Sequence, residues 1–298
     1  MPTPENILQR LDWQVIRRLD GILQGNYRSL FVGSGLDFAD LREYQWTDDV
    51  RYIDWNVTAR MNAPYVRQYV EDREITAWFL LDLSPSLDFG TVNALKRSLL
   101  IDFVAILARL LTRQGNRVGA VFYNGTDQHV ITAHGGREHV LRMMNDLMKQ
   151  PKLPRAPMTN LAMMLEHAAR AIHRRSLVFI VSDFISTPGW DKPLKLLVQK
   201  HEVLALRLFD PREIDLPDIG LVVMEDSETG EQLYIDTSDK KFRERFTQAA
   251  QKREYEMNVH FRQAGVDSLQ VSTEDDLVRA IVKFAMQRKQ KKQLPAVH

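Results

Sequence analysis

The sequence contains no cysteine, has almost no excess of charge of either sign and lacks a long apolar run. Without cysteine, the chain can form neither a disulfide, nor a thiolate nucleophile, nor a zinc site with sulfur ligands. Lys and Arg number 40 against 39 Asp and Glu, which gives a net charge of +1. General binding to nucleic acids or acidic membranes requires a strong basic excess. These absences disfavour thiol chemistry and nucleic-acid binding.

Apolar stretches are also too short for a membrane span. Uninterrupted runs such as 77–81 and 177–181 fall far below the roughly 18 residues that a transmembrane helix needs. The first ten residues are polar and lack the apolar core of a signal peptide. We therefore expect a protein without a membrane span that resides in the cytoplasm.

From residue 75 onward, apolar strand-like runs alternate with segments of helical periodicity. We expect strands at 75–83, 117–123, 129–132, 177–181, 202–208 and 268–271, and helices at 91–113, 138–149, 160–172, 192–200, 240–261 and 275–288. The strand at 75–83 is almost wholly apolar, as expected where both faces are covered. This alternation predicts an α/β fold of Rossmann-like type, with a mainly parallel central sheet and helices on both faces.

Three other regions complete the predicted organisation. An amphipathic helix is expected at about 5–24, followed by an irregular segment, and we expect region 1–74 to pack on the main domain. The main domain is predicted to span 75–290. Within it, apolar residues on both sides of the polar turn at 228–230 predict an inserted hairpin at 221–235. Residues 291–298 form a basic tail.

The residues with the clearest chemical potential follow the first predicted strand of the main domain. Asp82, Ser84 and Ser86 alternate with Leu83 and Pro85. Ligands of open parallel sheets bind beyond the carboxyl ends of the strands. A carboxylate and two hydroxyls at alternate positions there could converge on one hard cation, and oxygen ligands suit Mg²⁺ or Mn²⁺. On its own, this pattern is equally compatible with a turn or a helix cap.

Two further oxygen-bearing residues strengthen the metal interpretation. Thr159 lies in the loop before a predicted helix, and Asp183 follows the apolar strand at 177–181. Three separate strand ends or loops thus supply five oxygen-bearing side chains. We therefore predict a Mg²⁺ or Mn²⁺ site formed by Asp82, Ser84, Ser86, Thr159 and Asp183.

These five residues resemble the metal-ion-dependent adhesion site of von Willebrand factor A domains. The wider chain resembles the domain-of-unknown-function-58 family, whose members are found alongside MoxR-type AAA+ ATPases. The resemblance extends over nearly the whole chain, through segments 33–38, 41–44, 48–51, 53–56, 58–60, 182–184, 210–213 and 216–217. The sequence departs from the family pattern at Leu87, where Met is frequent, and at Met158, where Gly is usual.

The resemblance implies a von Willebrand factor A-like fold and a protein-binding module that is not an enzyme. By the family's pattern, Asp82, Ser84 and Ser86 would touch the metal directly. Thr159 would do so in some states, and Asp183 would act mostly through water. An open coordination position would remain for an acidic side chain of a partner, and the implied partner is a MoxR-type AAA+ ATPase.

The segment from Asp37 to Glu74 is rich in arginine, acidic and aromatic residues and has no lysine. Arginine is preferred over lysine where ion pairs are bidentate, stacked or partly buried. One interpretation is an intramolecular clamp, with Arg42, Arg51 and Arg60 pairing with Asp48, Asp49 and Asp54. The other is a protein interface, since Arg, Trp and Tyr dominate such surfaces. The two interpretations are compatible.

The main alternative is a Mg²⁺-dependent phosphatase of the haloacid-dehalogenase type. There the first Asp is the nucleophile, and a second acid two residues later protonates the leaving group. This chain has Ser84 at that second position, and an aliphatic hydroxyl is far too weak an acid for the task. The interval between Thr159 and Asp183 also contains no lysine to serve such an enzyme. Another alternative is a structural domain whose metal site is vacant.

Overall fold

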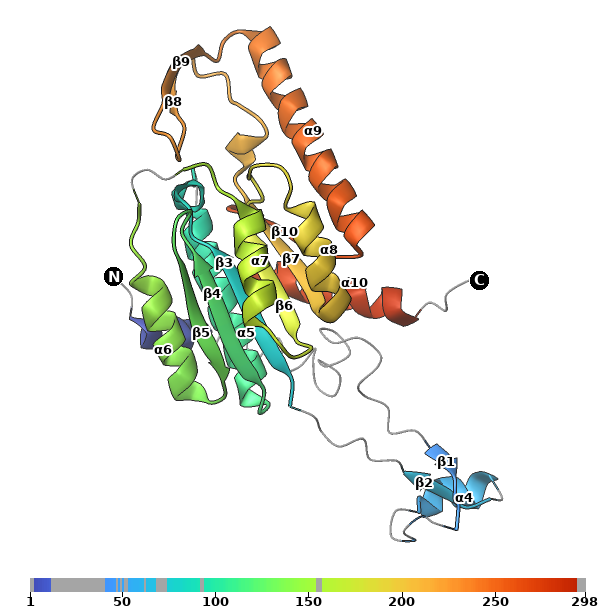
Figure 1. Ribbon diagram of the computed structural model, residues 1–298. Coiled ribbons are helices and arrows are strands. Elements are labelled where there is room, and N and C mark those ends of the chain that lie inside the picture. Colours follow the sequence, from blue (N-terminus) through green and yellow to red (C-terminus); the bar gives the residue numbers. More distant parts are fainter. Residues whose placement is uncertain are drawn as a thin grey trace.

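The core of the protein is a six-stranded sheet, seen in a computed structural model (Figure 1). Its strands are β3 (Thr76–Asp82), β4 (Arg117–Tyr123), β5 (Gln128–His134), β6 (Leu177–Ser182), β7 (Glu202–Phe209) and β10 (Asp267–Ser272). Neighbouring strands are parallel except for β5, which pairs antiparallel with β4. The structure describes residues 3–11, 41–46, 48, 50, 53–61, 63–67, 74–91, 94–153 and 157–293.

Helices cover both faces of this sheet (Figure 1). One face packs on α1 (Pro4–Leu11), α5 (Lys96–Arg113), α6 (Arg137–Met148) and α10 (Leu277–Gln293), and the other on α7 (Leu161–Ala171), α8 (Asp191–Lys200) and α9 (Lys240–Ala264). Each face of the sheet carries a hydrophobic core, and successive side chains of β3 point alternately into the two cores. Phe79 and Leu81 lie in the core with α5, and Trp78 and Leu80 lie in the core with α7. All of β3 from Ala77 onward is buried, which explains its unbroken apolar sequence.

The strand order is β10-β7-β6-β3-β4-β5. The chain runs outward from β3 to β5, then returns to the centre and runs the other way through β6, β7 and β10. Numbered along the chain within this sheet, the order is that of the doubly wound nucleotide-binding folds, and its direction reverses between β3 and β6. Such folds place their ligands at this switch point, beyond the carboxyl ends of the strands.

The structure confirms the predicted fold class and most predicted elements. One helix is shorter than expected, because α5 begins at Lys96 rather than at Thr91. The Thr91 backbone N–H and hydroxyl both donate to the Asp210 carboxylate, at 2.8 and 2.7 Å, and this tertiary contact takes Thr91 out of the helix. The amino-terminal helix is described over Pro4–Leu11, and the rest of its predicted range lies outside the described residues.

The predicted hairpin is present and stands apart from the central sheet. Strands β8 (Leu221–Glu225) and β9 (Gln232–Asp236) pair antiparallel and form a sheet of their own. Most of their side chains are exposed or half-buried. Figure 1 shows the tip of this hairpin pointing toward the carboxyl edge of the central sheet.

The Arg- and aromatic-rich segment forms a small unit. It contains β1 (Leu41–Glu43), α4 (Trp55–Met61) and β2 (Tyr65–Arg67), with β1 and β2 antiparallel. Arg42 and Asp48 form the predicted ion pair, with two hydrogen bonds of 2.8 and 2.5 Å. Asp49 and Arg51 lie outside the described residues. Helix α1 packs on the main domain, whereas packing of the rest of region 1–74 and the boundaries 75–290 and 291–298 stay predictions.

Helix α1 contributes to one of the two cores, because its Ile7 and Leu8 are buried in the core shared with α5 and α6. Over the described residues, no helix has the length and apolar character that crossing a membrane requires.

Candidate metal centre

Asp82 is the last residue of β3 and lies at the switch point of the sheet. Its side chain is fully buried. One carboxylate oxygen accepts the Ser84 backbone N–H at 3.0 Å, and the other accepts the Ser182 hydroxyl at 2.7 Å. Burial, and then the nearby Asp183 carboxylate, raise the pKa of Asp82 to about 6. A carboxylate in this position is costly to keep charged without a cation.

Ser84 and Ser86 lie in the turn that follows Asp82. The Ser84 N–H bond to Asp82 folds the chain back at once, and Pro85 begins a short 3-10 helix, η3 (Pro85–Asp88). Both serine side chains are buried, and their hydroxyl oxygens lie 3.1 Å apart. Three oxygen-bearing side chains from five consecutive residues therefore converge at the end of β3.

Asp183 follows the last residue of the neighbouring strand β6 and is also buried. One of its oxygens accepts the Ile185 N–H at 3.0 Å, and the other accepts the Lys96 ammonium at 2.8 Å. Phe184 has a φ of 59°, in the left-handed region that a bulky residue seldom adopts. Its N–H donates to the Ser182 hydroxyl at 2.9 Å, which helps to hold this unfavourable conformation.

Thr159 lies in the loop before α7 and is buried beside the ends of the strands. Its carbonyl accepts hydrogen bonds from Ser186 and Thr187, in the loop that follows β6. The next residue, Asn160, donates its N–H to the Tyr123 hydroxyl at the end of β4, at 3.0 Å. The Thr159 backbone N–H and hydroxyl both donate to the Glu228 carboxylate, the former at 2.7 Å.

The structure thus places all five predicted residues at the carboxyl edge of the sheet, on the ends of β3 and β6 and in the loop before α7. Asp82 and Asp183 interact through their charges, and Asp82 connects directly to the turn that carries Ser84 and Ser86. The Thr159 hydroxyl donates a hydrogen bond to Glu228, a contact that the sequence did not suggest.

Lys96 was missed by the sequence analysis. Its ammonium is completely buried and lies 2.8 Å from Asp183 and 2.6 Å from Glu213. Burial alone would lower the pKa of Lys96, but the two carboxylates outweigh burial and raise it. Lys96 lies outside the interval between Thr159 and Asp183, in which the phosphatase interpretation requires a lysine. A usable signal existed, since Lys96 lies three, four and seven residues before the apolar residues Leu99, Leu100 and Phe103.

Glu228 was also missed, and its sequence context gives little sign of its position. It lies in the turn of the β8–β9 hairpin, 69 residues after Thr159 along the chain. Burial first, and then the Asp183 and Asp226 carboxylates, raise the pKa of Glu228, although its hydrogen bonds from Thr159 lower it. The influence of Asp183 shows that the hairpin brings a further negative charge to the same edge of the sheet.

The chemistry of these side chains fits a small hard cation. All available ligand atoms are carboxylate or hydroxyl oxygens, the donors that Mg²⁺ and Mn²⁺ prefer. Asp183 and Glu213 pair with Lys96 and also interact with the buried Arg207, while Asp82 and Glu228 lie in the electrostatic range of Asp183. These four carboxylates outnumber the two cations. Within the described ranges, no group of three His, Asp or Glu side chains could hold a metal alone. A metal here would therefore depend on the Ser84, Ser86 or Thr159 hydroxyls.

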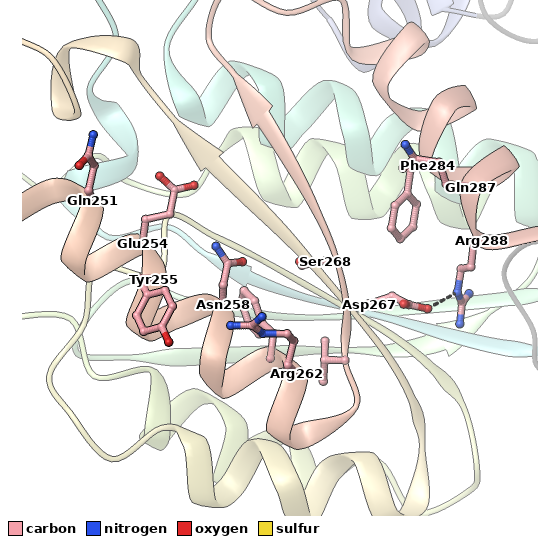
Figure 2. A pocket seen from close by; sticks show the side chains of 12 residues that line it. Gln251, Glu254, Tyr255, Asn258, Arg262, Asp267, Ser268, Phe284, Gln287 and Arg288 are labelled. Carbon is pink, nitrogen blue, oxygen red and sulfur yellow. Dashed lines mark hydrogen bonds and ion pairs between the residues drawn. The ribbon is translucent and has the colours of Figure 1, made fainter. Parts of the chain in front are cut away.

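A pocket lies beside the edge strand β10. It has a volume of about 960 Å³ and runs along the edge strand β10, between α9 and α10 (Figure 2). Asp267 and Ser268 line it at the amino end of β10, and Asp267 is paired with Arg288 at 2.8 Å. This pocket is separate from the candidate metal centre, because none of the five predicted residues lines it.

Fold and site together define a doubly wound α/β domain with a candidate oxygen-ligated metal centre at its switch point. Residues 40–256 match the family described as "Protein of unknown function DUF58", and the chain belongs to this family. It is 36% identical over 282 residues to the uncharacterized protein Rv1480 of Mycobacterium tuberculosis, covering 95% of this chain and 89% of that protein.

Solved structures resemble the chain at much lower identity. An aerotolerance-related membrane protein from Bacteroides fragilis is 14% identical, with a TM-score of 0.48, and covers 73% of this chain and 99% of its own. The VWA domain of SpRpn10 is 12% identical, with a TM-score of 0.40, and covers 70% and 94% of the two chains.

Proposed function

We propose that this protein is a metal-dependent protein-binding module, in which a Mg²⁺ or Mn²⁺ ion at the carboxyl edge of the sheet contacts an acidic residue of the partner. One observation carries this proposal. The buried Asp82 carboxylate, at the switch point, adjoins the turn whose two serine hydroxyls lie 3.1 Å apart. Asp82, Ser84 and Ser86 would hold the ion, and Thr159 and Asp183 would complete its surroundings.

The number of ligands favours an exchangeable contact. A hard octahedral cation takes about six oxygen ligands, and the five predicted residues do not supply six direct ones. Asp183 already forms an ion pair with Lys96. The Lys96 ammonium therefore offsets part of the negative charge that Asp183 would offer to the ion. When bound, the ion would offer a positively charged position to a carboxylate from another chain.

The partner we propose is a MoxR-type AAA+ ATPase, and we propose a cytoplasmic, non-enzymatic role. This choice is supported by the resemblance of the chain to its family, whose members are found alongside such ATPases. The exposed Trp46 and Trp55, in the Arg- and aromatic-rich segment, would add contact area to such an interface.

The phosphatase alternative gains a lysine from the structure but still lacks an acid. Lys96 is bonded to Asp183 and Glu213, and Ser84 remains where the leaving group would need a proton. We expect no hydrolysis of an aryl phosphate in Mg²⁺ beyond that of an Asp82→Asn variant. A Mg²⁺-dependent rate that Asp82→Asn removes would instead establish an enzyme.

Asp82→Asn should abolish binding of Mn²⁺ at this site. The substitution keeps the size of the side chain but removes the charged ligand at the centre of the proposed site. We expect a saturable isotherm for the wild type and no saturable binding by the variant over the same range of Mn²⁺ concentration. Isothermal titration calorimetry measures both.

The matched control is Asp127→Asn. Asp127 lies in the β4–β5 turn, near the same edge of the sheet, but its side chain is exposed. Its replacement should leave the isotherm unchanged. Equal binding by the wild type and Asp82→Asn would contradict a metal site on Asp82.

A further inference from the structure

The β8–β9 hairpin has one buried acidic residue in an otherwise exposed turn. Glu228 is only 8% exposed, whereas its neighbours Asp226, Ser227 and Thr229 are all exposed. The hairpin forms no part of the central sheet and contributes no residue to its two hydrophobic cores. Contact between its tip and the candidate metal centre is therefore not a by-product of core packing.

The contact is specific and is made by both oxygens of the carboxylate. One Glu228 oxygen accepts the Thr159 backbone N–H at 2.7 Å, and the other accepts the Thr159 hydroxyl. The turn itself is held by Asp226, which accepts the backbone N–H groups of Glu228 and Thr229 at 2.9 and 2.8 Å. The hairpin thus presents the Glu228 carboxylate in one fixed orientation.

Charge makes this arrangement unfavourable without a cation. Glu228 brings a carboxylate into the electrostatic range of Asp183, and Asp183 in turn interacts with Asp82. Like charges that converge in a buried site repel each other strongly, because the local dielectric constant is low. Lys96 supplies one positive charge at Asp183, and the Arg207 guanidinium, which is paired with Glu254, also acts on Asp183. A divalent ion between the acidic groups would offset the remaining repulsion.

We propose that Glu228 is an internal ligand of the candidate metal centre, occupying the coordination position that an acidic partner residue would otherwise take. This inference rests on the proposed function, since it concerns the same ion. An acidic residue of a partner must then displace the hairpin tip before it reaches the metal. The exposed Leu221, Val223, Leu233 and Tyr234 of the same hairpin lie on the segment that would have to move.

The test compares Mn²⁺ complexes of the wild type, Glu228→Gln and Glu231→Gln. Glutamine keeps the shape of the side chain but removes the anionic ligand. Glu231 lies in the same turn and is exposed, so Glu231→Gln removes the same charge from the same segment. Water-proton relaxation by bound Mn²⁺ reports how many water molecules the ion carries. We expect about one additional water in Glu228→Gln, and Mn²⁺ affinity weaker by about tenfold.

Hydrogen exchange gives a second readout, which is measured first on the wild type. Adding Mg²⁺ to the wild type should slow amide exchange in residues 225–231, because the ion ties the hairpin tip to the sheet. The same addition should not slow exchange there in Glu228→Gln.

The outcomes separate this inference from the function on which it rests. If the wild type and Glu228→Gln carry the same number of waters and show the same hairpin exchange, Glu228 is not a ligand. The metal site itself would still stand, provided that Asp82→Asn abolishes Mn²⁺ binding. If the wild type binds no Mn²⁺, both proposals are overturned.

Discussion

Replacement of Lys96 by methionine is expected to lower the free energy of unfolding by about 3–5 kcal/mol, the usual cost of removing one partner from a buried ion pair. Methionine fills a similar volume, so the loss would come from charge rather than from a cavity. Two carboxylates, Asp183 and Glu213, would lose the ammonium that lies within 2.8 Å of each. Urea denaturation of the metal-free protein measures the effect.

Two further variants make this result interpretable. Lys195→Met removes an exposed lysine that pairs with Asp191 one helical turn away at 3.8 Å, and should change stability by less than about 1 kcal/mol. Combining Lys96→Met with Asp183→Asn and Glu213→Gln should recover part of the loss, because the stranded negative charges are then gone. Equal losses for Lys96→Met and Lys195→Met would contradict the proposed role of the buried ammonium.

Asp82→Asn is expected to stabilise the metal-free protein by roughly 3 kcal/mol above pH 6, at about 1.36 kcal/mol for each unit of pKa shift. The folded protein raises the pKa of Asp82 from 3.8 to about 6. Folding therefore favours the protonated carboxyl, so this contribution to stability is complete below the unfolded pKa and is lost as the pH rises through the folded pKa. The difference between variant and wild type should be small at pH 4, grow between about pH 4 and 6, and level off at higher pH.

Denaturation of both proteins in EDTA across this pH range tests the prediction. Saturating Mg²⁺ should then stabilise the wild type alone, by about 2.7 kcal/mol at a hundredfold excess over the dissociation constant. Asp82 would then destabilise the metal-free protein and yet be required for ion binding. Such a trade-off between stability and function is expected of a functional site. A constant difference between the proteins from pH 4 to 8 would show that Asp82 does not titrate as proposed.

Much of the fold could be predicted because four strands of the central sheet, β3, β4, β6 and β7, are buried on both faces. Their runs of apolar residues are too short for helices, and the alternation with periodic helical segments identifies a parallel sheet. Asp82 and Asp183 could be placed near each other for the same reason, since both follow such strands. The start of α5 could not be predicted, because Thr91 leaves the helix for a contact with Asp210, 119 residues away.

The candidate site was predicted less completely than the fold. Alternate spacing in Asp82, Ser84 and Ser86 is a local pattern and is visible in the sequence. Lys96 and Glu228 reach the site from α5 and from the hairpin through contacts 87 and 69 residues apart in the chain. Pairings of that kind depend on how the elements pack, and no local spacing encodes them. Of the two, only Lys96 could be recognised from the sequence, because it is a charged residue on the apolar face of its helix.

The central claim is that an ion on Asp82 mediates binding to another protein. The most direct measurement is the affinity of the chain for a MoxR-type AAA+ ATPase from the same organism, in Mg²⁺ and in EDTA, with Asp82→Asn in parallel. We predict that EDTA and Asp82→Asn each weaken binding by about tenfold or more, roughly 1.4 kcal/mol. Equal affinity under all three conditions would contradict a metal-mediated contact, and no binding under any of them would remove the proposed partner.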